Sequence, residues 1–79
     1  MLIVSFSIAV ERDRAEEMQN VLMNDYGIAI TKEVVYKERL CWDEPVSRVY
    51  FECFASIARL ESLTHYLDNT FTGTAILSY

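Results

Sequence analysis

The side chain with the clearest capacity for acid–base chemistry is His65, the single histidine of the chain. If the residues around it form a helix, Glu61 and Asp68 lie on the same helix face, where their carboxylates could pair with the imidazole. A catalytic histidine also needs a nucleophile or a second ligand, and no such group is near it in sequence. We therefore interpret His65 as a solvated surface residue, and we predict a non-enzymatic protein with no catalytic residue.

The two cysteines are the other chemically active side chains. Cys41 and Cys53 are too far apart for the C-x-x-C motif of metal and redox sites. The hairpin predicted below separates them along its strands, beyond the reach of a disulfide. Two free thiols are typical of a reducing compartment, which predicts a cytoplasmic protein. We predict no metal ion and no cofactor.

A long β-hairpin between Ile28 and Ser56, turning at Asp43-Glu44-Pro45, is the element around which the chain is organised. With the turn centred on Glu44-Pro45, one face pairs Trp42 with Ser47, Leu40 with Val49 and Tyr36 with Cys53. This apolar face, which we expect in the core, also includes Val34. The other face pairs Arg39 with Tyr50, Lys37 with Glu52 and Val35 with Phe54. This register gives a cross-strand ion pair, a cation–π pair and an apolar pair. A β-bulge would shift the register, and we expect any such bulge near Lys32 or Glu38.

Hydrophobic periodicity predicts the remaining elements. Residues 2–10 alternate as a half-buried strand, and Asp13 with Glu16 forms a capping box for a helix that stops at Gly27. Ser56 caps a second helix, which Phe71 closes against the core. Residues 74–79 make a last strand. The predicted buried face of the second helix comprises Ile57, Leu60, Leu63, Thr64 and Leu67.

The resulting order, β-α-β-β-α-β, resembles the ferredoxin-like fold. It predicts one α+β domain over residues 1–79, with a four-stranded antiparallel sheet and two helices on one face. The first and third strands would be central.

Several families of this fold are disfavoured by particular residues. The stretch Arg48–Phe54 is similar in rhythm to the third strand of an RNA-recognition motif, but Glu52 stands where that family has a stacking aromatic. The first strand offers Ser5 and Ser7 instead of a ring. The loop at residues 11–14 has neither the C-x-x-C of metal chaperones nor the glycines of acylphosphatases. It also lacks the glycine-bearing turn usual in amino-acid-sensing ACT domains, although dimerisation through an open sheet could still build a pocket.

The charge of the chain bears on its partners. Its net charge is −5 over 79 residues, which argues against binding to nucleic acid through lysine and arginine. An acidic surface that is simply solvated explains this charge, and so does a partner protein with a basic surface. The apolar stretch Met1–Val10 lacks the features of a signal peptide, and no apolar run is long enough to span a membrane.

Two surfaces remain for binding. The first is the sheet face left uncovered by the helices, on which we place Ser5, Ser7, Val35, Lys37, Arg39, Tyr50, Glu52 and Phe54. The second is the hairpin tip, Trp42-Asp43-Glu44, where a tryptophan flanked by acids could dock on a basic protein. The candidate partner-binding residues are Trp42, Asp43, Glu44, Lys37, Arg39, Tyr50, Glu52 and Phe54.

The sequence therefore favours a small acidic module that binds another protein or a second copy of itself. Compact acidic chains of this kind are similar to phage-encoded inhibitors of host complexes, such as anti-CRISPR proteins, in size, charge and lack of catalytic motifs. The alternative is a small-ligand-sensing regulatory dimer that resembles ACT domains.

Overall fold

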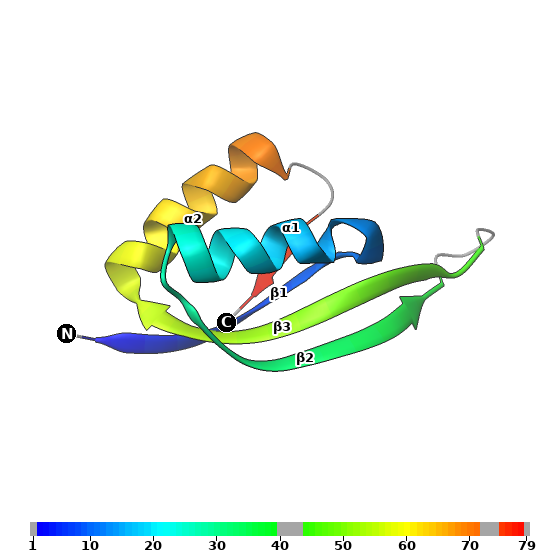
Figure 1. Cartoon of the computed structure of the whole chain (residues 1–79), viewed down its shortest axis with the longest axis horizontal. Coiled ribbons are helices and arrows are strands. Elements are labelled where there is room, and N and C mark those ends of the chain that lie inside the picture. Colours follow the sequence, from blue (N-terminus) through cyan, green and yellow to red (C-terminus); the bar gives the residue numbers. More distant parts are fainter. Residues whose placement is uncertain (1, 40–43, 72–74, 79) are drawn as a thin grey trace.

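The computed structural model describes residues 2–39, 44–71 and 75–78 (Figure 1). The strands are β1 (Ile3–Glu11), β2 (Ala29–Glu38), β3 (Val46–Ser56) and β4 (Ala75–Ser78). A helical segment after β1 comprises a 3-10 turn (Arg12–Arg14), helix α1 (Ala15–Asn20) and a π-helical end (Val21–Asp25). Helix α2 (Ile57–Thr70) follows β3 directly.

The strands form an antiparallel sheet in the order β2-β3-β1-β4. Helices α1 and α2 lie together on one face of this sheet, and no helix of residues 2–39, 44–71 or 75–78 lies on the opposite face (Figure 1). The predicted α+β class, the antiparallel pairing and the two helices are confirmed. No helix among the described residues is long and apolar enough to cross a membrane.

The two long strands β1 and β3 form the floor of the core because their apolar residues alternate. Phe6, Ile8 and Val10 of β1 are buried. Every second residue of β3 from Val49 to Ala55 is buried as well. This face forms one core cluster with the buried residues Met18, Leu22, Leu60, Leu63, Leu67 and Phe71. Period-two burial on one face is what fixes the orientation of a strand.

The first helical segment begins differently from the prediction. Helical structure starts at Arg12, no side chain caps it, and Asp13 lies inside the 3-10 turn. The predicted capping box of Asp13 and Glu16 is therefore wrong, because the strand runs into the turn without placing Asp13 at the extended position that an N-cap requires. The predicted stop is confirmed: Gly27 has φ +59°, and the Ile28 amide donates to the Leu22 carbonyl at 2.8 Å.

Helix α2 agrees with the prediction at its ends. The Ser56 hydroxyl accepts a hydrogen bond from the Arg59 amide at 3.4 Å, as an N-cap does, and Phe71 is buried at the other end. The predicted buried face is wrong at Ile57, which is 41% exposed and lines a cleft together with Val4 of β1, and Thr64 is only half-buried. The Arg59 guanidinium donates to the Tyr26 carbonyl at 2.6 Å and so joins the two helical segments.

The register predicted for the hairpin is wrong. In the structure Tyr36 pairs with Arg48, Lys37 with Ser47 and Val35 with Val49. The predicted pairs Lys37–Glu52, Arg39–Tyr50 and Val35–Phe54 do not form. Strand β2 ends at Glu38 and strand β3 begins at Val46, so the two strands are farther apart in sequence than a turn on Glu44-Pro45 requires. A register irregularity lies between Ile30 and Lys32, close to where one was expected.

Candidate functional site

Among the described residues, the face of the sheet opposite the helices has no covering element (Figure 1). Residues opposite one another in the ladder share a face, so the register assigns this surface row by row. The rows across β2, β3 and β1 are Ala29–Phe54–Ser5, Lys32–Glu52–Ser7, Val34–Tyr50–Ala9 and Tyr36–Arg48–Glu11. We call this surface the uncovered sheet face.

An aromatic ring stands out of this face. Phe54 lies in β3, which has a strand on each side, and it is 45% exposed. Its lateral neighbours Ala29 and Ser5 are too small to cover a phenyl ring. Ile3, diagonal to it on β1, is 53% exposed, and Val34 is 37% exposed. Three large apolar side chains are thus in water on one face, although such groups gain free energy when they are covered.

Charged groups lie between and beside the apolar residues, because the row Lys32–Glu52–Ser7 separates the row of Phe54 from the row of Val34. Arg48 Nε lies 2.5 Å from Glu38 Oε2 and forms an ion pair with it. The Tyr50 hydroxyl donates to Glu52 Oε1 at 3.3 Å, and Lys32 lies opposite Glu52 in the ladder. Protein interfaces likewise combine apolar side chains with polar and charged groups.

The structure brings together only part of the predicted site. Tyr50, Glu52 and Phe54 lie on the uncovered sheet face, as do Ser5 and Ser7. Lys37 and Val35 do not: they pair with Ser47 and Val49 and therefore belong to the helix side. Arg39 follows the end of β2 and is exposed, and Glu44 is exposed. Trp42, Asp43 and Cys41 lie outside the described residues.

Sequence reasoning missed three residues of this face. Val34 and Tyr36 were expected in the core, and the register places both on the uncovered side. Ile3 was included in the weakly polar side of the first strand, without a role in binding. A signal for Ile3 was present, because it is in phase with Ser5 and Ser7 on an alternating strand.

Cys53 and His65, two of the side chains with the capacity for chemistry, lie in ordinary structural environments. Cys53 is a free thiol in the core, and burial raises its pKa from the ordinary 9.0 to about 11, so it is a weak nucleophile at neutral pH. His65 is exposed, with its Nε2 atom 3.4 Å from the Asn69 amide nitrogen. The part of the chain that the structure describes holds no cluster of three or more His, Cys, Asp or Glu suited to a metal ion.

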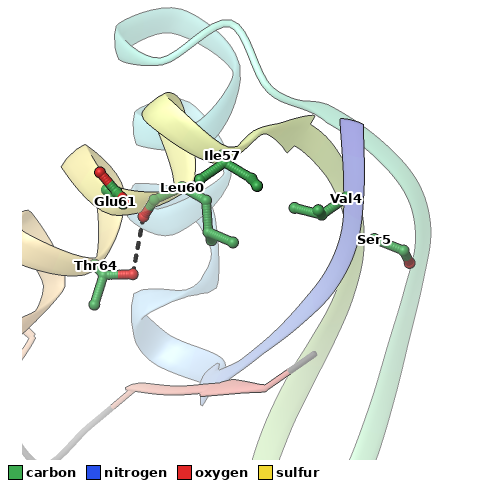
Figure 2. Close-up of a pocket in the computed structure, with 6 residues that line it drawn as sticks. All are labelled: Val4, Ser5, Ile57, Leu60, Glu61 and Thr64. Atoms are coloured by element: carbon green, nitrogen blue, oxygen red, sulfur yellow. Dashed lines mark hydrogen bonds between the residues drawn. The ribbon is translucent and has the colours of Figure 1, made fainter. Parts of the chain in front are cut away.

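A second feature is a cleft of about 650 Å³ between β1 and the first half of α2 (Figure 2). Val4 from the strand and Ile57 from the helix point toward one another across it (Figure 2). It is lined by Val4, Ser5, Ile57, Leu60, Glu61 and Thr64. The Thr64 hydroxyl donates to the Leu60 carbonyl at 2.8 Å, which leaves the wall of the cleft mostly apolar.

Comparisons with known proteins add a likeness in fold. No protein-family model matches the chain, and no curated protein matches it. Among solved structures, the chain is similar to the "Structure of CPII bound to ADP, AMP and acetate, from Thiomonas intermedia K12". The superposition covers 99% of this chain and 88% of the other, with a TM-score of 0.61 and 9% sequence identity. At that identity the likeness concerns the fold alone.

Proposed function

We propose that this chain is a small non-enzymatic module that binds another protein through the uncovered sheet face. The observation that carries the proposal is the exposure of Ile3, Val34 and Phe54 on one helix-free side of the sheet. Large exposed apolar side chains that gather on one face of a domain mark a site of interaction. A partner that covered these three side chains would remove them from water, and it would also cover Lys32 and Glu52, which lie in the row between Phe54 and Val34.

The charge of the chain indicates what kind of protein the partner is. A net charge of −5 favours a protein with a basic surface, since opposite fields speed encounter and suppress wrong partners. The hairpin connection with Trp42, Asp43 and Glu44 lies next to the ends of β2 and β3 in sequence, so we propose it as a second contact. Lys37 lies on the helix side and Arg39 lies at the end of β2, so we assign both to this second contact and not to the uncovered sheet face. Inhibition of a host complex by a phage-encoded protein is one biological setting that fits a module of this size and charge.

The proposal is tested by site-specific photocross-linking. A benzoylphenylalanine is placed at position 54 on the uncovered face, and in a matched variant at Met23, which is 52% exposed on the helical side. We expect a single major adduct from position 54 and none of that mass from position 23. The adduct is identified, the partner is purified, and binding is measured again with Phe54→Ser. Equal cross-linking from both positions, or unchanged affinity of Phe54→Ser, would contradict the proposal.

A second candidate function is a ligand-sensing dimer with the complete four-stranded ferredoxin-like sheet. It is favoured by the likeness to CPII, whose structure is described as bound to ADP, AMP and acetate. Thermal unfolding with ADP and with AMP, combined with light scattering, separates the candidates. A dimer whose melting temperature rises with either nucleotide supports the sensor, whereas an unliganded monomer that cross-links from position 54 supports the protein-binding module.

A further inference from the structure

One edge of the sheet is incomplete near the start of β1. Strand β3 pairs with β1 along its whole length, from Ile3 to Glu11. On the other side of β1, β4 pairs only with Ser7–Val10. Among the described residues, no strand lies beside Ile3–Phe6 on that side. Because alternate residues of an antiparallel strand direct their N–H and C=O groups to the same side, part of this stretch presents backbone donors and acceptors outward.

The opposite edge of the sheet is protected, and this one is not. Strand β2 carries Lys32, Glu33, Lys37 and Glu38, with a bulge between Ile30 and Lys32. Charges and bulges are the usual means by which proteins prevent another strand from adding to an edge. The stretch from Leu2 to Val10 contains no charged residue, proline or glycine. A bare, uncharged edge is competent to accept a further strand.

The apolar cleft lies beside this same open edge. Val4 and Ser5 line it from β1, and Ile57, Leu60, Glu61 and Thr64 line it from α2. Figure 2 shows the Val4 side chain turned toward α2 and the Ser5 side chain turned away from it. A residue paired with Val4 on an added strand would point to the same side as Val4. Its side chain would therefore enter the space between Val4 and Ile57.

We propose that this edge is a binding site for an extended peptide segment of another protein, added as a strand beside Ile3–Phe6. Backbone hydrogen bonds to β1 hold the segment, and an apolar side chain facing Val4 fills the cleft. A second helix-side position of the segment carries a lysine or arginine, because Glu61 is the one charged residue among the described residues that line the cleft. This recognition mode takes its affinity from the main chain and its specificity from pockets for alternate side chains.

A second copy of the chain fits this edge poorly. Its own edge segment would have to supply the side chains for the cleft, but Phe6 is buried in its own core and no cation is present from Leu2 to Val10. Pairing two copies would also bring together two Glu61 carboxylates and two chains of net charge −5. Charge complementarity therefore favours a basic, alternating apolar segment of a different protein. The cleft lies on the helix side of the sheet, and the site shares only the β1 residues Ile3 and Ser5 with the uncovered sheet face, on whose function it does not depend.

The test uses a short N-acetylated peptide in which valine, leucine and lysine alternate with threonine, and its reverse-order isomer, so that either strand direction is sampled. Amide chemical shifts of the full chain are followed during titration. We expect saturable shifts at Ile3–Phe6 and Ile57–Thr64, and none at Lys32–Val35 on the protected edge. Of two peptides that are N-methylated at the two alternate sets of residues, the one whose methyl groups face β1 should not bind, whereas the other keeps its hydrogen bonds to the strand. If neither isomer shifts the cleft amides at millimolar concentration, the proposal is overturned.

Substitutions locate the site. Ile57→Asp places a carboxylate in the cleft at a helix N-terminus that tolerates it, and should weaken peptide binding about tenfold or more. Met23→Asp, an equal change on the helical side, should leave binding unchanged. Glu61→Lys should weaken binding of the lysine-containing peptide about fivefold. A peptide with glutamate in place of that lysine should restore the lost affinity in this variant. Unchanged affinity in Ile57→Asp would contradict the proposal. So would a dimer in sedimentation equilibrium that this change dissociates, since it would assign the edge to a second copy.

Discussion

Two phenylalanines on β3 provide a matched test of which sheet face is exposed to solvent. Phe51 is fully buried on the helix side, and Phe54 is 45% exposed on the uncovered sheet face. Both belong to the same strand, so strand propensity and backbone effects are similar in the two positions. The perturbation is alanine at each position in turn.

The structure sets the size of each effect. Full burial of a phenylalanine side chain contributes about 1.5–3 kcal/mol, and roughly half of that contribution is present for Phe54. Phe54→Ala should therefore cost about 1 kcal/mol in the free energy of unfolding. Phe51→Ala removes the same atoms from a packed core and leaves a cavity, so it should cost about 3–5 kcal/mol. In a domain of this size, a loss of about 1 kcal/mol corresponds to a change of about 4–8 °C in Tm.

The assay is urea unfolding followed by far-ultraviolet circular dichroism, with the slope m compared between the variants. Equal losses for the two alanine variants would refute the reasoning, because they would mean that Phe54 is as well covered as Phe51 in the free chain. A large loss for Phe54→Ala alone would refute it too, since the two faces of β3 would then be exchanged. A variant Phe51→Ala that fails to fold satisfies the expectation only if Phe54→Ala folds.

Three further outcomes follow from individual residues. Gly27→Ala should cost about 1–2 kcal/mol in thermal unfolding, because φ is +59° and a Cβ would lie 2.7 Å from Arg59 Nη1; a Gly27→Asn variant should lose less. Ser56→Ala should cost about 1 kcal/mol, since its hydroxyl caps α2, and an unchanged Tm would refute that cap. Burial raises the pKa of Cys53 to about 11, above its ordinary 9.0, so the stability from the protonated thiol is complete below pH 9 and is lost as pH rises toward 11. The stability gap between the native chain and Cys53→Ala should narrow over that range, and a gap that widens would show the opposite shift.

The elements that bury one face were predictable from the sequence. In β1 and β3 the apolar residues alternate over a full strand, so only one orientation buries Phe6, Ile8 and Phe51 together. The end of the first helical segment was also predictable, because Gly27 supplies the positive φ that stops a helix.

The register of β2 could not be predicted, for a physical reason. Val34, Val35 and Tyr36 are consecutive, so their pattern does not distinguish the two faces of the strand. Because β2 is an edge strand that is mostly exposed, core packing does not select a register either. The bulge before Lys32 then shifts the phase of the strand. The composition of the uncovered sheet face depends on this register, which is why Val34 was assigned to the wrong side.

In the proposed complex, the partner covers the uncovered sheet face. Cross-saturation of methyl groups, measured in the complex with the partner that cross-links from position 54, shows which side chains the partner covers. We expect the strongest signal loss at the methyl groups of Ile3 and Val34, and none at Met23 on the helical side. Strong loss at Met23 with Ile3 and Val34 unaffected would contradict it.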